Sequence, residues 1–303
     1  MTTAAELKIK QERLISIIED ELQDLPSLPA VVVRVMQSLN NPKTSASDLN
    51  QIISSDQALA SKLLRLVNSP YYGFPRRITT ITHAVVILGQ NTVRNLTLSL
   101  GVCGAFNGSS SHQSLDREKF WAHSMGCAVA AQAIAKRRRL SVKQTEEVFV
   151  GGLLHDLGKL FLDQYFPDQY VITLKLARQA NISIWEAEKA ALGIGHIVVG
   201  KRIAERWALP PSLVAMISMH HQPPYARDFT EQVWTVHAAD YVVRKMQIGN
   251  SGDNVTPQIA PEVAKWLGFD QSAWTRIETE TADRFKESEE FLRMATGRAV
   301  EQA

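Results

Sequence analysis

At residues 150–159 the chain reads Val150-Gly151-Gly152-Leu153-Leu154-His155-Asp156-Leu157-Gly158-Lys159. This stretch places an imidazole beside a carboxylate at the end of an apolar run, with a lysine three residues further on. Side chains that could complete a metal site with the pair lie elsewhere in the chain: His123, His196, His220, His221 and Asp240. Imidazole and carboxylate without thiolate form a nitrogen and oxygen donor set, which suits iron, manganese, zinc or nickel.

Length and composition are those of an ordinary globular protein. The 303 residues are enough for one large or two ordinary domains, and 45% of them are apolar. The net charge of +2 does not indicate a general polyanion binder. No apolar run reaches the roughly 18 residues that cross a bilayer, and the first residues lack the basic head and apolar core of a signal peptide. We therefore expect a cytoplasmic protein without a membrane segment.

The two cysteines, Cys103 and Cys127, lie in apolar helical sequence without a CxxC spacing. Such cysteines are typical of small buried hydrophobic residues in a reducing compartment.

The spacing of apolar residues predicts helices throughout the chain and no strand, so the expected fold class is all-α. In the first part, Ser47 is expected to cap one helix and Ser55 or Asp56 the next. Thr80 opens another helix, which Gly89 closes. The expected helices cover 5–23, 30–39, 47–53, 56–67, 80–88 and 91–106.

The serine- and glycine-containing segment Asn107–Ser114 is the clearest linker, and we place a domain boundary there. It separates an N-terminal helical lobe (1–106) from a helical bundle (115–247) that carries the candidate metal ligands, and C-terminal helices (248–303) follow. After the linker, helices are expected over 116–136, 145–155, 183–193, 196–207, 210–221 and 230–247, with a mixed region up to 182 and two helices within 261–296.

A single histidine in an apolar helix is more often a packed side chain than a ligand. The present set is spread over five helices or helix ends, and facing helices of a bundle can bring such side chains together. Adjacent helical residues point about 100° apart, so His220 and His221 hardly share one ion unless the helix end distorts before Pro223. His237 lies three residues before Asp240 and either orients it or is a half-buried histidine.

Several sequence blocks together resemble the HDOD domain, a bacterial signalling relative of the HD and HD-GYP phosphohydrolases. The similarity covers residues 24–222 in the order of that family. The blocks are Leu25-Pro26-Ser27-Leu28-Pro29, Ile52-Ile53-Ser54-Ser55-Asp56-Gln57-Ala58-Leu59, Leu66-Val67-Asn68-Ser69-Pro70-Tyr71-Tyr72-Gly73, Ile81-Thr82-His83-Ala84-Val85-Val86-Ile87-Leu88-Gly89, Gly152-Leu153-Leu154-His155-Asp156-Leu157-Gly158-Lys159 and Gly195-His196.

The resemblance implies an HD-like bundle with a metal site. The metal pattern of the HD superfamily falls on His123, His155, Asp156 and Asp240, and the additional histidines of HD-GYP enzymes fall on His196, His220 and His221. In those relatives the motif aspartate bridges two metal ions, which would be the role of Asp156. We therefore expect a binuclear site for divalent ions, with iron first and manganese, zinc or nickel as alternatives.

Two departures from the HD-GYP pattern argue against catalysis of that type. His221 is followed by Gln222-Pro223-Pro224-Tyr225, and no Gly-Tyr-Pro loop comes after it. Some relatives place a glutamate four residues before the first histidine to hold a third metal ion, and this chain has Lys119 there. The resemblance thus implies two ions at most.

Three functions are compatible with these residues. The first is a regulatory signalling protein with a metal centre, acting on an unidentified partner protein. The second is a metal-dependent phosphohydrolase or phosphodiesterase, in which Lys159 would contact the phosphate of a phosphoester or nucleotide. An enzyme needs an open metal position and a cleft, whereas a structural centre is closed off by the protein.

The third function, nucleic-acid binding, rests on the basic run Lys136–Arg139. No base-reading motif accompanies this run, and basic residues also favour a helix C-terminus, so we do not expect a nucleic-acid partner. The aromatic loop Asn68–Pro75 either forms a contact surface or packs the N-terminal lobe onto the bundle.

Overall fold

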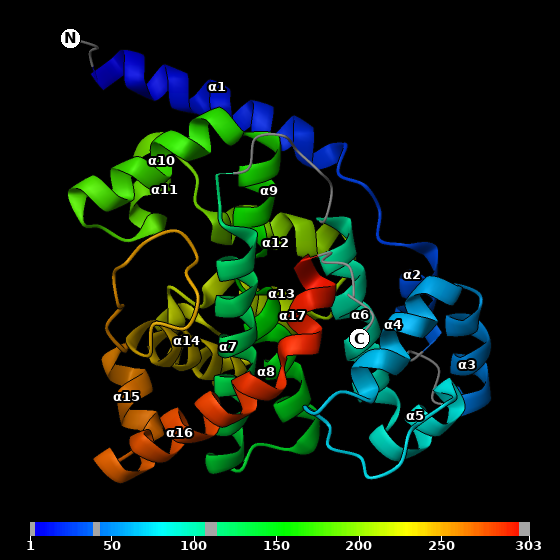
Figure 1. Ribbon diagram of the computed structural model, residues 1–303. Coiled ribbons are helices and arrows are strands. Elements are labelled where there is room, and N and C mark those ends of the chain that lie inside the picture. Colours follow the sequence, from blue (N-terminus) through cyan, green and yellow to red (C-terminus); the bar gives the residue numbers. More distant parts are fainter. Residues whose placement is uncertain (1–3, 39–42, 107–113, 297–303) are drawn as a thin grey trace.

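The computed structural model describes residues 4–38, 43–106 and 114–296, and within these ranges the chain is helical without any strand (Figure 1). The predicted all-α class is confirmed. No described helix is long and apolar enough to cross a membrane. The helices before the linker are α1 (Ala4–Gln23), α2 (Ala30–Ser38), α3 (Ala46–Ser54), α4 (Gln57–Val67), α5 (Ile81–Leu88) and α6 (Gln90–Ala105).

Polar caps start the short helices of the N-terminal part. Ser45 caps α3, because its hydroxyl accepts a hydrogen bond from the Asp48 amide while the Asp48 carboxylate accepts one from the Ser45 amide. The predicted cap at Ser47 is therefore wrong, since Ser47 already lies in the first turn. Asp56 caps α4 and Thr80 caps α5, as predicted.

The bundle contains the central helices of the chain. Ser141 and Gln144 form a capping box, so the helix expected over 145–155 begins at Val142. The bundle helices are α7 (Arg117–Arg137), α8 (Val142–Leu154), α9 (Leu157–Tyr165), α10 (Pro167–Ala180), α11 (Ile184–Leu192), α12 (His196–Arg206), α13 (Pro211–Met219), the 3-10 turn η1 (Pro223–Tyr225) and α14 (Thr230–Lys245).

The region described as mixed in the sequence contains two helices, α9 and α10. The chain turns at the central motif: α8 ends at Leu154 and α9 begins at Leu157, so His155 and Asp156 occupy the turn between two helices. Pro167 starts α10, where its fixed φ and missing amide proton suit the first helical position.

The last part of the chain forms three described helices, not the two expected: α15 (Pro261–Leu267), α16 (Gln271–Glu287) and α17 (Glu289–Thr296). Gly268 ends α15 in the left-handed conformation, and the chain turns again at Ser288. Helices α16 and α17 pack on α7, and α17 also contacts α4 and α6. The C-terminal helices thus join the N-terminal lobe to the bundle.

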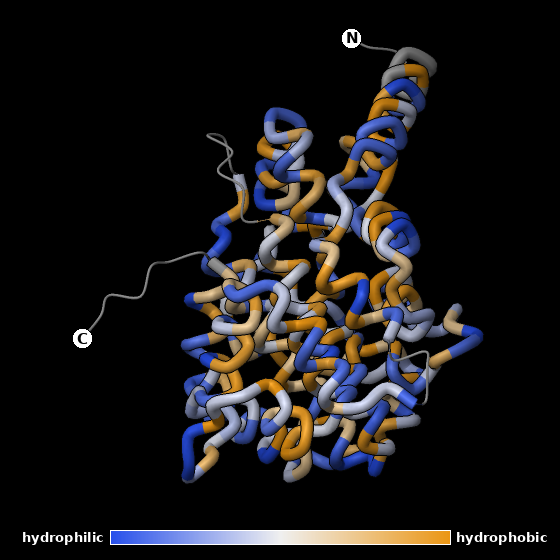
Figure 2. Tube along the Cα trace, turned by 90° about the vertical axis from the view of Figure 1, so that its right-hand side faces the viewer, coloured by the Kyte–Doolittle hydropathy of each residue, from blue (hydrophilic) through white to orange (hydrophobic). Residues whose placement is uncertain are grey.

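Helix α1 lies across the bundle and not with the rest of the N-terminal lobe (Figures 1 and 2). The Gln11 amide donates a hydrogen bond to the Ala190 carbonyl of α11, and Arg202 of α12 lies 2.6 Å from Glu19. Residues 107–113 of the expected linker lie outside the described residues, so the predicted domain boundaries stay predictions.

Tyr71 in the aromatic loop joins the lobe to the bundle. Its hydroxyl donates a 2.8 Å hydrogen bond to Gln132 of α7, and its ring lies 5.9 Å from that of Phe149. The guanidinium of Arg284 from α16 sits 4.2 Å over the same ring. Of the two roles expected for the aromatic loop, Tyr71 therefore has that of packing the N-terminal lobe onto the bundle.

The basic run at the end of α7 contacts the C-terminal helices. The Arg138 guanidinium stacks 4.6 Å over the Trp266 ring, and Lys136 lies 3.7 Å from Glu280. That these residues have no nucleic-acid partner remains a prediction.

Candidate metal centre

All seven predicted metal ligands lie close together inside the bundle. His123 comes from the middle of α7, and His155 and Asp156 from the turn between α8 and α9. The others come from the start of α12 (His196), the end of α13 and the residue after it (His220 and His221), and α14 (Asp240). Six of the seven are at most 2% exposed, and His221 is half-buried.

The Asp156 carboxylate lies at the centre, with its two oxygens facing different histidines. Oδ2 is 3.3 Å from His155 Nε2 and 3.8 Å from His123 Nε2. Oδ1 is 3.3 Å from His196 Nε2 and 3.6 Å from His220 Nε2. The carboxylate therefore divides the donors into two groups.

These spacings fit donors that share an ion. Two nitrogen or oxygen ligands at about 2.1 Å from one tetrahedral ion are about 3.4 Å apart. The distance between His123 Nε2 and Asp240 Oδ1 is 3.2 Å. The potential ligand atoms form two groups, and the atoms within each group lie within 4.8 Å of one another. The first group comes from His123, Cys127, His155 and Asp240. The second comes from Asp156, His196, His220 and His221.

Several atoms of the cluster are buried without a hydrogen-bond partner. Such atoms cost about 1–3 kcal/mol each when left unsatisfied, and a cation would satisfy those that carry lone pairs. Among the described residues they include His155 Nε2, Asp156 Oδ1, His196 Nε2, His220 Nε2 and His221 Nε2. The chemistry of the cluster therefore fits a bound metal ion.

Backbone carbonyls set the orientation of two imidazoles. His155 Nδ1 donates a 2.7 Å hydrogen bond to the Gly152 carbonyl, and His220 Nδ1 donates one of 3.0 Å to the Ile217 carbonyl. In each ring the proton then sits on Nδ1, and the lone pair of Nε2 points into the cluster. Because α13 ends at Met219, the rings of His220 and His221 can both face the same group, with centroids 4.2 Å apart.

Glu188 of α11 orients His196 and was not predicted from the sequence. Its Oε2 accepts hydrogen bonds from His196 Nδ1 at 2.6 Å and from the His196 amide at 2.7 Å, while Oε1 accepts one from the Tyr170 hydroxyl at 2.8 Å. Carboxylates in this position fix the tautomer of a metal-binding histidine and raise its basicity. A buried glutamate eight residues before a histidine is not a recognisable sequence signal.

Replacing this carboxylate should weaken metal binding without removing a ligand. We expect Glu188→Gln to lower metal affinity by about 10-fold to 100-fold, because an amide cannot accept all three hydrogen bonds. Chelator competition on the purified protein measures the change. Glu205→Gln, at a half-exposed site on α12, is the control, and equal affinities for the two variants would contradict this role of Glu188.

Two buried cations face the carboxylates of the cluster. Lys159 Nζ donates to Asp156 Oδ2 at 2.7 Å, and Arg244 Nε donates to Asp240 Oδ1 at 2.8 Å. Ser251 Oγ lies 3.2 Å from both Lys159 Nζ and Arg244 Nη2. Lys159 is fully buried, so its expected contact with a phosphate stays a prediction and its observed partner is the central carboxylate.

The segment 248–253, which follows α14, closes the centre on one side. Gly249 has a φ of +64°, and a Cβ there would lie 2.3 Å from the His123 amide nitrogen. The Asn250 amide donates to the Lys119 carbonyl of α7 at 2.9 Å. Asp253 Oδ2 accepts a 2.8 Å hydrogen bond from the amide of Ile184, the first residue of α11. The backbone of this segment thus lies directly against the helix that carries His123.

The electrostatic environment favours the protonation states that bind metal. Burial lowers the pKa of His220 to about 4, and burial together with His220 holds the pKa of His221 well below its usual value. Burial raises the pKa of Asp156, but the nearby His155 and Lys159 lower it by more than burial raises it. The net pKa of Asp156 is therefore well below its usual range. Neutral imidazole and ionised carboxylate are the forms that coordinate metals.

His196 differs from the other histidines of the centre. Burial is the largest influence and lowers its pKa, but the Glu188 and Asp156 carboxylates together leave the pKa of His196 raised. The Nε2 atom is correspondingly more basic and a stronger donor to a cation.

Two further side chains border the centre. Cys127, expected to be a buried hydrophobic residue, is buried, but its Sγ lies 3.6 Å from His123 Nε2 within the first group of donors. Its position four residues after His123 places the two side chains on one face of α7, but this spacing alone does not mark a ligand. His237 donates from Nδ1 to the His220 carbonyl at 2.7 Å and accepts at Nε2 from the Ala260 amide, so it supports His220 and not Asp240.

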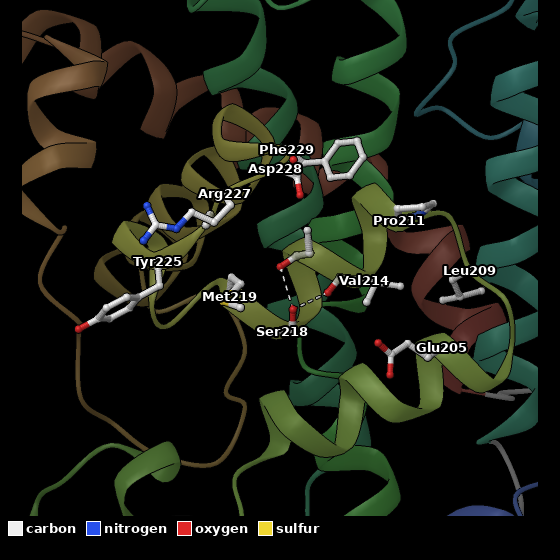
Figure 3. Close-up of a pocket in the computed structure, with 12 residues that line it drawn as sticks. Glu205, Leu209, Pro211, Val214, Ser218, Met219, Tyr225, Arg227, Asp228 and Phe229 are labelled. Atoms are coloured by element: carbon white, nitrogen blue, oxygen red, sulfur yellow. Dashed lines mark hydrogen bonds between the residues drawn. The ribbon is translucent and has the colours of Figure 1, made fainter.

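A separate pocket of about 530 Å³ lies between α13 and the segment leading to α14 (Figure 3). Ser218 lines it, and its hydroxyl donates to the Val214 and Ala215 carbonyls of its own helix. Tyr225 and Phe229 form part of the rim. None of the predicted metal ligands lines this pocket.

Comparison with known families matches the HDOD domain over residues 25–223, which is more than half of the chain. The chain therefore belongs to the HDOD domain family. This confirms the resemblance inferred from the sequence blocks.

Solved structures share the fold. An HDOD domain protein of unknown function from Geobacter sulfurreducens is 25% identical, with a TM-score of 0.72 over 95% of this chain and 98% of the other. A provisionally described signal transduction protein from Marinobacter aquaeolei VT8 is 21% identical, with a TM-score of 0.76 over 98% of this chain and 68% of the other. A provisionally described phosphohydrolase from Shewanella amazonensis SB2B is 22% identical, with a TM-score of 0.71 over 92% and 97%.

An uncharacterized protein from Treponema pallidum (strain Nichols) is 25% identical over 286 residues. The match covers 94% of this chain and 54% of that relative, so the chain spans about half the length of the relative.

Proposed function

We propose that this chain is a regulatory signalling protein of the HDOD family whose bundle holds two divalent metal ions bridged by Asp156. The observation that supports this most directly is the division of donors by the Asp156 carboxylate, with His155 and His123 facing Oδ2 and His196 and His220 facing Oδ1. One ion would be held by the group with Asp240 and the other by the group with His221. The imidazole and carboxylate donors suit iron best, with manganese, zinc and nickel as alternatives.

The closure of the centre favours a regulatory role over turnover. Six of the seven ligands are at most 2% exposed, and Lys159 and Arg244 are hydrogen-bonded to the carboxylates of the cluster. The pocket that reaches the centre at His123 measures about 180 Å³, below the roughly 300–1,000 Å³ of ordinary ligand sites. An enclosed centre of this kind holds its ions as part of the fold and leaves little room for a phosphoester.

Hydrolysis of a phosphoester is the second candidate function. The observation that favours it is that His123 and Arg244 line the same small pocket, so a metal ligand and a cation share one opening. Bound divalent ions would supply a water of lowered pKa and polarise a phosphoryl oxygen. Arg244 could then orient an anionic group, provided that its hydrogen bonds to Asp253 and Ser251 were exchanged.

Elemental analysis of protein purified without chelator, paired with a phosphodiesterase assay on a nitrophenyl phosphodiester, tests both functions. We expect close to two metal ions per chain and no turnover above a metal-free control. Two ions with metal-dependent turnover would replace the regulatory proposal with the enzymatic one. Protein without metal that also fails to take up added ions would contradict both.

Removing the metal should destabilise the chain. Each ion that binds only to the folded state stabilises it by about 2.7 kcal/mol at a free concentration one hundred times its dissociation constant, so two ions contribute about 5 kcal/mol. We expect the free energy of unfolding in urea to fall by about this amount after chelator treatment and to recover when the ions are returned. Magnesium, which prefers an octahedral oxygen environment, should not restore it, and identical unfolding curves with and without chelator would count against a bound metal.

A further inference from the structure

A sulfur atom lies within the donor cluster. Cys127 is on α7, one helical turn after His123, and its side chain is fully buried. Residues four apart on a helix share a face, so the thiol points to the same side as the His123 imidazole. Sγ and His123 Nε2 are 3.6 Å apart.

This separation fits two ligands of one ion. With a metal–sulfur distance of about 2.3 Å and a metal–nitrogen distance of about 2.05 Å, tetrahedral geometry places the two ligand atoms about 3.6 Å apart. Cys127, His123, His155 and Asp240 each offer one ligand atom within 4.8 Å of the others. A thiol that only filled the core would not need to lie within 4.8 Å of three other potential ligand atoms.

A second observation points to the same position. Nε2 of His155, in this group of four, is buried without a hydrogen-bond partner. Its ring is held by the bond from Nδ1 to the Gly152 carbonyl, which leaves the Nε2 lone pair directed into the cluster. The other cysteine, Cys103, is equally buried in α6 but belongs to neither group of donors.

We propose that Cys127 is a thiolate ligand of the ion held by His123, His155 and Asp240, which rests on the proposed metal centre. The two positions of the centre are then chemically different: one has two imidazoles, a thiolate and the carboxylates of Asp240 and the bridging Asp156, and the other has imidazoles and the Asp156 carboxylate. On coordination the sulfur–hydrogen bond breaks, its proton passes to the buffer, and the sulfur lone pair forms the metal–sulfur bond. The oxidation state of the metal does not change.

A thiolate changes which ions the first position accepts. Soft sulfur ligands favour zinc, cobalt and ferrous iron over magnesium, calcium and manganese, which prefer oxygen. The position at His123 is thus selective for thiophilic ions, while the position at His196 is the more permissive one.

Cobalt(II) substitution of the full-length chain tests this directly. We expect the cobalt-loaded protein to show a sulfur-to-cobalt charge-transfer band in the near ultraviolet. Cys127→Ser should lose the band and bind the first ion at least about tenfold more weakly, since a lost ligand exceeds the effect of a lost supporting hydrogen bond. Cys103→Ser places the same buried hydroxyl in α6 and should keep both the band and the affinity.

X-ray absorption of the zinc-loaded wild-type protein gives a reading that does not depend on any variant folding. A zinc–sulfur path near 2.3 Å supports the proposal. Bound ions with only nitrogen and oxygen neighbours, or a charge-transfer band that persists in Cys127→Ser, would overturn the sulfur ligand and leave the metal centre intact. Failure of the wild-type protein to bind cobalt or zinc at all would overturn the metal centre and this inference with it.

Discussion

Asp156→Ala is expected to abolish metal binding and to lower the free energy of unfolding by about 3–5 kcal/mol even in metal-free protein. The carboxylate faces both groups of donors, so its loss removes a ligand from each. It also leaves the Lys159 ammonium, fully buried, with Ser251 Oγ as its remaining partner. Urea unfolding in the presence of chelator isolates the effect of the unpaired charge, and elemental analysis without chelator gives the metal content.

The double variant Asp156→Ala with Lys159→Met separates the two effects. Removing both charges of a buried pair is far less costly than removing one, so most of the stability should return while metal binding does not. If the double variant is no more stable than Asp156→Ala, the pairing of Lys159 with Asp156 does not carry the effect. Full metal content in either variant would contradict a bridging Asp156.

Gly158→Ala should destabilise the protein by about 3 kcal/mol or more, at the upper end of the cost of overpacking. A Cβ at Gly158 would lie 2.1 Å from the His196 carbonyl oxygen and 2.8 Å from the Gly200 amide nitrogen. Both are backbone atoms of α12, so relief requires α9 and α12 to separate. Because His196 begins α12, we also expect weaker metal binding, and both effects are measured by denaturant titration and chelator competition.

Gly104→Ala is the matched control. Gly104 lies in α6, and nothing is within 4 Å of a Cβ built there. Alanine is favoured over glycine by about 0.5–1 kcal/mol inside a helix, so this variant should be equally or more stable. If Gly158→Ala matched it, the close crossing of α9 and α12 would not constrain the fold.

The fold class and most helices could be predicted because apolar periodicity and polar caps are local signals. Asp56 and Thr80 cap helices where the sequence indicated. Helices α9 and α10 were missed because they follow the turn at Asp156 closely and the second begins at Pro167, which reads as a helix breaker. The sequence predicted two helices within 261–296, whereas three are described there. The break between α16 and α17 was missed because Ser288 and its neighbours include no glycine or proline to mark a turn.

The donors of the candidate site could be predicted because histidine is scarce in this chain and because their order matches the pattern of the HD superfamily. All seven predicted ligands lie together. Glu188 and Cys127 were missed, since a glutamate or cysteine in a helix carries no mark of what it faces until the helices are packed. Lys159 lies three residues after its partner Asp156, whereas its second partner, Ser251, is 92 residues away, and no local pattern shows that contact.

Ser251 has one further consequence. Its hydroxyl lies between Lys159 and Arg244, the counter-ions of Asp156 and Asp240, while the chain that carries it continues into the helices α15 to α17. Helix α17 in turn touches α4 and α6 of the N-terminal lobe. One continuous stretch of polypeptide therefore runs from the charged groups beside the proposed metal centre to the N-terminal lobe.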